Sequence, residues 1–273
     1  MRELHTFAIC AYQDSPYLEA CIRSVTTQSQ PTNVILCTST PSAYIRSLAE
    51  KYRIPMYVRE GESDIQADWN FAYEMADSRY VTIAHQDDLY SRSYVKTLAR
   101  YLQKYPDTSL FTTDYVTVKD HQLVFGERLV RIKKLLRLPL RIPRLNHISW
   151  VKKAALCFGN SICCPACTYR KAASKKNGAE GSPKPFFDSE CRFALDWDHL
   201  ITMAEEPGRF ICAEKPLVYH RLHKDAATNV CMKNSIRFQE EQQMFSRLWP
   251  EPAVRLLMKY YQKAYDSYDV TVQ

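Results

Sequence analysis

Residues 80–90 read Tyr-Val-Thr-Ile-Ala-His-Gln-Asp-Asp-Leu-Tyr, an apolar run that ends abruptly in two adjacent carboxylates, Asp87 and Asp88. The first five residues are β-favouring or small, so the stretch predicts a buried strand over residues 80–84 with the acids at its carboxyl end. In an open α/β sheet the ligand crevice lies outside the carboxyl ends of the strands. The two acids are therefore expected to face a ligand.

Adjacent carboxylates repel each other unless they share a cation, and Mg²⁺ or Mn²⁺ takes oxygen ligands together with substrate phosphates. The pair thus predicts a site for a divalent metal and a diphosphate. A second interpretation stays open, because acids that precede a helix also satisfy its free N–H groups and its positive dipole end.

Predicted strands and helices alternate around this stretch. Strands are expected at residues 5–11, 34–37, 56–58, 80–84 and 110–118, with helices that begin near Ser15, Thr40, Asp64 and Ser93. This alternation implies parallel strands joined by right-handed crossovers. Residues 1–118 are expected to form a doubly wound α/β half and residues 119–230 the second half of the same domain. That second half is expected to hold a helix near residues 193–201 and short strands at 210–213 and 217–220. Residues 231–273 are expected to form a helical tail interrupted at Pro250 and Pro252.

The composition is that of a soluble globular chain, with 273 residues, 46% hydrophobic and 25% charged. No run approaches the roughly 20 apolar residues that span a bilayer, and the start lacks the apolar core of a signal peptide. A cytoplasmic protein is expected, with its ten cysteines reduced. Cys157, Cys163, Cys164 and Cys167 offer only one closely spaced pair, which disfavours a zinc site.

Residues 127–144 form a basic segment in which seven cations alternate with leucine, isoleucine and valine: Arg128, Arg131, Lys133, Lys134, Arg137, Arg141 and Arg144. Such a segment can bind an anionic membrane surface or a phosphorylated substrate. It is also typical of a solvated helix face whose leucines pack on the core. Pro139 and Pro143 prevent one long helix. Nucleic acid is disfavoured as a partner, because no nucleic-acid-binding module accompanies the charges.

Several stretches occur in a fixed order along the chain: residues 9–14, residues 18–28, Asn70, residues 85–88, Phe187, residues 196–198 and residues 216–223. Together they resemble the successive blocks of the family 2 glycosyltransferases of the GT-A fold, and the series is more specific than any single block. The resemblance implies a GT-A-like, doubly wound, mixed and mostly parallel sheet with an acceptor-side subregion. It also implies sugar transfer from a nucleotide diphosphate donor, usually with inversion.

The resemblance also implies roles for individual residues. Asp87 would bind Mn²⁺ or Mg²⁺, with Asp88 and His223 as further candidates near the metal or the diphosphate. Asp196 would be the base that deprotonates the acceptor hydroxyl, a task that suits a carboxylate; alternatively it only caps a helix. The nucleoside would be flanked by Ala11, Tyr12, Ser39, Asn70, His85 and Gln86.

The chain departs from the family pattern at two places. Residues 37–40, Cys-Thr-Ser-Thr, stand where the family's second strand usually ends in paired acids, one of which reads the base. His85 stands where the family's metal motif has its first acid. A histidine there can hydrogen-bond a ribose hydroxyl, or it is simply a half-buried side chain without a ligand.

The resulting hypothesis is a metal-dependent, inverting transferase that moves a sugar to a glycan or lipid-linked sugar in surface polysaccharide biosynthesis. The expected donor is a UDP-sugar. The protein would be cytoplasmic or peripheral at the inner face of the membrane through residues 127–144. A nucleotidyltransferase is disfavoured, because no glycine for a phosphate loop occurs before Gly61. A non-catalytic partner subunit of the same fold also stays open, since the two departures favour it, whereas Asp87 and Asp196 disfavour it.

Overall fold

The computed structural model of the chain describes residues 3–119, 122–171, 185–223 and 236–269, without the side chains of residues 263–269. The strands are β1 (His5–Ala11), β2 (Asn33–Thr38), β3 (Met56–Val58), β4 (Tyr80–His85), β5 (Leu89–Tyr90), β6 (Thr108–Lys119), β7 (Gln122–Val124), β8 (Thr168–Arg170) and β9 (Arg209–Leu222). The helices are α1 (Leu18–Thr26), α2 (Ala43–Tyr52), α3 (Ile65–Met75), α4 (Tyr94–Lys104), α5 (Arg128–Leu136), α6 (Ser149–Ala154), α7 (Leu195–Glu205), α9 (Ile236–Leu248) and α10 (Glu251–Asp269), with 3₁₀ turns η1 (Leu138–Arg141) and η2 (Cys164–Ala166).

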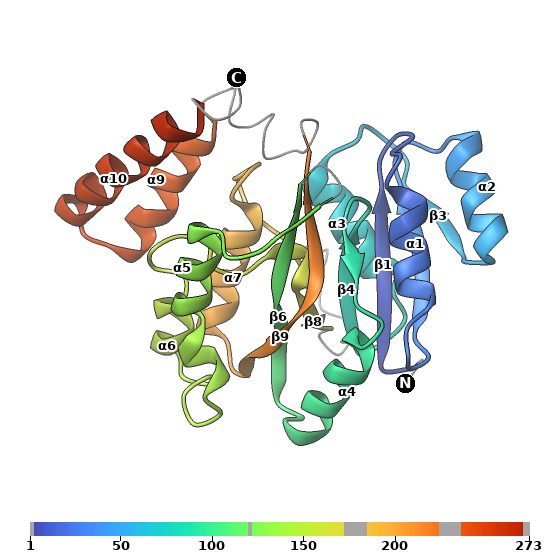
Figure 1. The fold of residues 1–273 in the computed structure, drawn as a ribbon, viewed down its shortest axis with the longest axis horizontal. Coiled ribbons are helices and arrows are strands. Elements are labelled where there is room, and N and C mark those ends of the chain that lie inside the picture. Colours follow the sequence, from blue (N-terminus) through green and yellow to red (C-terminus); the bar gives the residue numbers. More distant parts are fainter. Residues whose placement is uncertain (1–2, 120–121, 172–184, 224–235, 270–273) are drawn as a thin grey trace, which may run out of the picture.

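The described strands form one mixed sheet in the order β3-β2-β1-β4-β8-β6-β9-β5, with β7 paired to β6. Neighbouring side chains of β1 point to opposite faces, as the strand period of two requires. Phe7 packs with residues of α1, α2 and α4, whereas Ala8 packs with residues of α3 and α7. Figure 1 shows the strands in the middle, with α1 and α2 on one side and α5, α6, α9 and α10 on the other. The predicted GT-A-like, doubly wound, mostly parallel class is confirmed.

The junction between the two halves differs from the prediction. The strand expected at residues 110–118 forms as β6, but β8 lies between β4 and β6 and is antiparallel to both. β6 instead runs parallel to β9. The two short strands expected at residues 210–213 and 217–220 are one strand, because β9 passes Pro216 through a shift in register opposite Asp114. Proline is tolerated within a strand at such an irregularity, since its missing N–H is not needed there.

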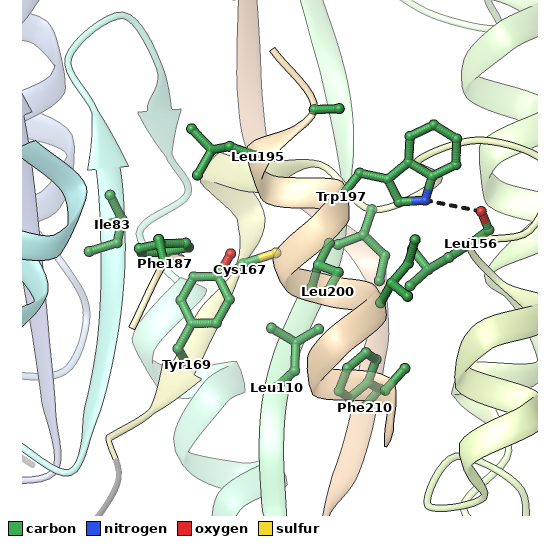
Figure 2. Close-up of a cluster of buried hydrophobic side chains, with 14 of the residues drawn as sticks. Ile83, Leu110, Leu156, Cys167, Tyr169, Phe187, Leu195, Trp197, Leu200 and Phe210 are labelled. Carbon is green, nitrogen blue, oxygen red and sulfur yellow. Dashed lines mark hydrogen bonds between the residues drawn. The ribbon is translucent and has the colours of Figure 1, made fainter. Parts of the chain in front are cut away.

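The larger part of the core lies between the sheet and α7 (Figure 2). Leu110 and Phe210 reach it from the strands and Leu200 from α7, while the Trp197 indole donates a hydrogen bond of 3.1 Å to the Leu156 carbonyl. The C-terminal helices pack on the same cluster, with the Phe245 ring 5.2 Å from that of Trp197. The tail therefore packs on this domain, and it breaks between α9 and α10 at Pro250, as predicted. The second interruption, expected at Pro252, is wrong, because that proline lies in the first turn of α10, where its missing N–H is not needed.

Helix α5 exposes most of its apolar side chains and three of its cations, Arg128, Arg131 and Lys134, whereas Lys133 is half-buried. It has no fully buried residue, and four apolar side chains of α5 and η1 are exposed: Leu129 (45%), Ile132 (44%), Leu135 (64%) and Leu138 (42%). Arg137, directly after α5, is fully buried; its guanidinium lies 2.9 Å from Asp114 and also donates to the Ser161 carbonyl. The interpretation that these leucines pack on the core is therefore wrong for α5, because ion pairing at Asp114 holds the helix with these side chains exposed.

Candidate active site

The turn after β4 brings Asp87 next to His223, which follows β9. One Asp87 carboxylate oxygen lies 3.1 Å from His223 Nε2, and the other accepts a hydrogen bond of 3.2 Å from the Ser15 hydroxyl. Ser15 was expected to cap α1, but that helix begins at Leu18 with Tyr17 in the N-cap position. The Ser15 hydroxyl instead orients Asp87, and a carboxylate and an imidazole converge at the carboxyl edge of the sheet.

Asp88 joins the same turn to β9. Its carboxylate is buried and accepts hydrogen bonds from His220 Nδ1 at 3.1 Å and from the Arg221 amide at 2.8 Å. Burial opposes ionisation of both partners, but His220 holds the pKa of Asp88 low and Asp88 holds the pKa of His220 high. Asp88 therefore acts in this geometry as a buried ion-pair partner that positions the end of β9, and with it His223.

The Asp87 and His223 pair fits a divalent ion that arrives with a nucleotide. Within the described ranges, no three His, Cys, Asp or Glu side chains gather as a metal-binding group. Mg²⁺ sites, however, usually combine one or two protein ligands with substrate phosphates and water. The Asp87 oxygen and the His223 nitrogen, which face each other, could supply two such ligands.

Two residues expected near the nucleoside connect β1 to this turn. The Gln86 side chain accepts a hydrogen bond of 2.9 Å from the Tyr12 amide and donates one of 3.0 Å to the Tyr12 carbonyl. Ala11 before it is buried, whereas 48% of Tyr12 is exposed. Gln86 thus holds the end of β1 and leaves the Tyr12 side chain accessible at the sheet edge.

Ser39 and Asn70 each bind another part of the protein. Ser39, after β2, donates a hydrogen bond of 2.9 Å to the Asp68 carboxylate, which also lies 2.7 Å from Arg59 Nε. Asn70 donates to the Phe187 carbonyl and accepts from its amide, both at 2.8 Å. The end of β2 lacks the paired acids of the family pattern, but Asp68 of α3 lies beside it and accepts from Ser39. The sequence pattern did not indicate this acid.

His85 offers an uncharged ring nitrogen at the end of β4. Burial lowers its pKa, more than the neighbouring Asp88 raises it. Its Nε2 atom is buried and has no hydrogen-bond partner among the residues that the structure describes. The ring lies 5.1 Å from that of Trp69. A neutral imidazole nitrogen with this geometry can bond a ligand hydroxyl.

Asp196 lies in the first turn of α7 and is half-buried. Its oxygens accept hydrogen bonds from the Trp197 amide at 2.8 Å and from the Asn160 side chain at 2.7 Å. The amides of Phe193 and Ala194, just before the helix, instead donate to Glu240 of α9. The role of helix cap thus belongs mainly to Glu240, while burial raises the pKa of Asp196 to about 6.

A glycine shapes the loop that delivers Asn160. Gly159 has a φ of +111°, and a Cβ atom there would collide with the Tyr261 hydroxyl of α10. That hydroxyl donates a hydrogen bond of 2.9 Å to the Phe158 carbonyl. The C-terminal helix therefore supports the loop that holds Asn160 against Asp196.

Both candidate centres act electrostatically on cysteines at the start of η2. Burial raises the pKa of both Cys163 and Cys164. The negative charge of Asp88 raises the pKa of Cys163 further, and that of Asp196 raises the pKa of Cys164 further. Lys133 of α5 is also near, since its charge acts on both Asp196 and His220. Sequence reasoning gave Lys133 no role of its own, because it lies within the run of basic residues. The described residues thus offer a half-buried carboxylate, a separate carboxylate and imidazole pair, and a cation whose charge acts on Asp196 and on His220.

Comparisons with known proteins agree with this architecture. The family model described as Glycosyl transferase family 2 matches residues 6–173. TarS 1–349 from S. aureus has a similar structure, with a TM-score of 0.60, 14% identity, and coverage of 93% of this chain and 69% of TarS 1–349. The same TarS fragment in complex with UDP-GlcNAc also gives a TM-score of 0.60 at 14% identity, covering 89% of this chain and 71% of the fragment.

The mannosyltransferase PcManGT from Pyrobaculum calidifontis, in complex with GDP-Man and Mn²⁺, gives a TM-score of 0.61 at 14% identity, covering 95% of this chain and 69% of that one. A search among curated proteins found no match. The structural likenesses establish the shared fold, and the family match extends over more than half of the sequence. The chain belongs to glycosyl transferase family 2.

Proposed function

We propose that the protein transfers a sugar from a nucleotide diphosphate donor to a hydroxyl of a glycan or lipid-linked sugar, with inversion. The donor that we propose is a UDP-sugar. The observation that carries this proposal is that one domain holds both a half-buried Asp196 carboxylate, oriented by Asn160 and the Trp197 amide, and the Asp87 and His223 pair at the carboxyl edge of the sheet. Similar structures bind UDP-GlcNAc, or GDP-Man with Mn²⁺, which supports a nucleotide-sugar donor.

On the donor side, Asp87 and His223 would hold Mn²⁺ or Mg²⁺, with Asp88 fixing the end of β9. The ion would offset the negative charge of the departing diphosphate. Tyr12, Ser39 and His85 would flank the nucleoside, His85 through its free ring nitrogen. Ala11, Gln86 and Asn70 would shape this side through the backbone contacts that they make.

On the acceptor side, Asp196 would take the proton of the attacking hydroxyl. A base works best when its pKa lies near the working pH, and burial raises the pKa of Asp196 to about 6. Hydrogen bonds from Asn160 and the Trp197 amide orient the carboxylate. Attack from the face opposite the departing diphosphate inverts the anomeric centre.

Calorimetric titration of UDP, GDP and their sugars, with and without Mn²⁺, tests the proposal. We expect a UDP-sugar to bind more tightly with Mn²⁺, and UDP to be released when a glycan or lipid-linked sugar acceptor is added. Nucleotide-sugar binding without turnover on any acceptor would favour the non-catalytic partner. Absence of nucleotide binding with Mn²⁺ would contradict the proposed donor.

We further propose that the outward face of α5 contacts an anionic membrane, with the protein peripheral at the inner face and acting in surface polysaccharide biosynthesis. The exposed side chains of Leu129, Ile132 and Leu135 recur three residues apart, and no acid occurs in α5. Arg128 and Arg131 on the same exposed side complement anionic headgroups. No helix in the described ranges is long and apolar enough to cross a bilayer.

This proposal predicts that the protein co-sediments with anionic phosphatidylglycerol vesicles, and that binding weakens with salt because exposed charges are screened over about 10 Å at 0.1 M. Replacing Ile132 and Leu135 with serine should abolish co-sedimentation. Leu256→Ser removes an equally exposed leucine from α10 and should leave it unchanged. Failure of the parent protein to bind anionic vesicles at low salt would contradict membrane docking through α5.

A further inference from the structure

The inward face of α5 leads toward the candidate base. Lys133 and Arg137 are one helical turn apart, so they lie on the same side. Arg137 is fully buried and donates to the Ser161 carbonyl. Ser161 directly follows Asn160, whose side chain donates to Asp196. Lys133 is half-buried, whereas its neighbours Ile132 and Lys134 are exposed, which agrees with a side chain turned inward.

Three elements other than α5 sense the charge of Lys133. Burial raises the pKa of Asp196 on α7 and of Glu241 on α9, and the positive charge of Lys133 opposes that rise. Burial and Lys133 both oppose protonation of His220 on β9, whose pKa Asp88 nevertheless raises. Lys133 is therefore within electrostatic range of the candidate base and of His220, the ion-pair partner of Asp88.

The Lys133 ammonium has no compensating contact in the described part of the chain, where it makes no hydrogen bond or ion pair. Burial lowers its pKa, although Cys163 and Asp196 oppose this effect. Removing a cation from water is costly unless an anion pairs with it. The neighbouring Arg137 and Lys134 are both paired with Asp114, which leaves Lys133 as the inward cation of α5 available to a ligand.

We propose that Lys133 binds a substrate phosphate beside Asp196, an inference that rests on the proposed transferase function. A lysine ammonium is a compact charge with three donors, which suits phosphate oxygens. The phosphate can belong to the donor diphosphate, whose departing charge Lys133 would then offset. It can also belong to an acceptor that carries a phosphate near its reacting hydroxyl. In either case α5 contributes a substrate-binding residue to the site.

Lys133→Met in the full chain tests this role, with Lys134→Met as the matched control. Lys134 is the next residue of the same helix, carries the same charge, and is 53% exposed with one ion pair at 3.4 Å. Charge-assisted hydrogen bonds contribute about 1.5–3 kcal/mol, so we expect the affinity for the phosphate ligand to fall roughly 10- to 100-fold in Lys133→Met. Lys133→Arg should retain part of it, and Lys134→Met nearly all.

Calorimetry with UDP, uridine and inorganic pyrophosphate, each with Mn²⁺, identifies the source of the phosphate. A donor phosphate predicts weaker UDP and pyrophosphate binding in Lys133→Met, with uridine binding unchanged. An acceptor phosphate predicts unchanged UDP binding and a higher KM for a phosphorylated acceptor.

Pyrophosphate binding that depends on Lys133 would support the phosphate site even if no nucleotide sugar bound, so the two proposals fail separately. Parental affinity for all three ligands, together with an unchanged acceptor KM, would overturn the inference. If Lys133→Met melts at a lower temperature than the parent, the same binding measurements are made on Lys133→Gln, which also removes the charge but keeps a polar side chain.

Discussion

Replacing Asp196 with asparagine is expected to lower kcat by about 100-fold or more, the usual scale for loss of a general base. Asparagine keeps the size of the side chain, and its carbonyl oxygen can still accept from the Trp197 amide or from Asn160. The variant should therefore fold and bind UDP as the parent does, because the base acts on the acceptor and not on the donor. Release of UDP at saturating acceptor measures the effect, and thermal melting checks the fold.

The same substitution should change the pH dependence of the reaction. Because burial raises the pKa of Asp196 to about 6, the carboxylate becomes protonated as the pH falls through that value. A protonated carboxyl cannot accept the hydroxyl proton, so parental kcat should decline below about pH 6. The Trp197 amide, Lys133 and Asn160 all favour the ionised form of Asp196, and none of them is changed by the substitution. Asp196→Asn should have a low residual rate that lacks this acid limb.

Asp198 offers a matched control two residues along the same helix. Its carboxylate accepts from the Ser189 hydroxyl and pairs with Arg247 of α9, so it connects elements instead of facing Asn160. Asp198→Asn should lower the free energy of unfolding while keeping kcat within a few-fold of the parent. The reverse pattern, with near-parental kcat in Asp196→Asn and a large loss in Asp198→Asn, would assign the base to Asp198.

The sequence predicted the first four parallel strands well, because each carries a continuous apolar run followed by an amphipathic helix. It did not predict the pairing of β6 with β9 or the insertion of β8 between β4 and β6. β8 reads Thr-Tyr-Arg, so no apolar run marks it as a strand, whereas the equally short β3 reads Met-Tyr-Val. Which strand lies beside β6 depends on contacts between segments far apart in the chain, and local patterns do not encode them.

The orientation of the basic segment shows the same limit at the site. Alternating cations and leucines fit either an outward charged face or an outward apolar face. Asp114 on β6 draws Arg137 and Arg141 inward at 2.9 and 2.8 Å, while apolar residues and cations of α5 both stay exposed. Lys133 is half-buried on the same side of the helix as Arg137, and its proposed role becomes visible only after the helix is placed against the loop that carries Asn160.

Asp87→Asn is expected to weaken UDP binding in the presence of Mn²⁺, to remove most of its Mn²⁺ dependence, and to cut turnover by about two orders of magnitude or more. A bound metal supplies several kcal/mol of charge stabilisation to the departing group, and each 1.4 kcal/mol is tenfold in rate. Asparagine is neutral and no longer attracts the cation. Titration of UDP with and without Mn²⁺ measures the first effect, and steady-state kinetics the second.

Asp14→Asn is the control for a general loss of negative charge at this edge of the sheet. Asp14 lies in the loop after β1 and accepts a hydrogen bond from the Ser42 hydroxyl, outside the Asp87 and His223 pair. Its removal should leave the Mn²⁺ dependence intact. If Asp87→Asn bound UDP with the Mn²⁺ dependence of the parent, the metal would have to be held elsewhere.

Asp88 is the obvious substitute after loss of Asp87, but its contacts oppose that role. Its carboxylate already accepts from His220 and from the Arg221 amide and is almost fully buried. Turning it toward a metal would break a buried ion pair, which costs about 3–5 kcal/mol when one partner is left uncompensated. The neighbouring acid therefore cannot rescue the variant cheaply, and the loss in Asp87→Asn should persist even at high Mn²⁺ concentration.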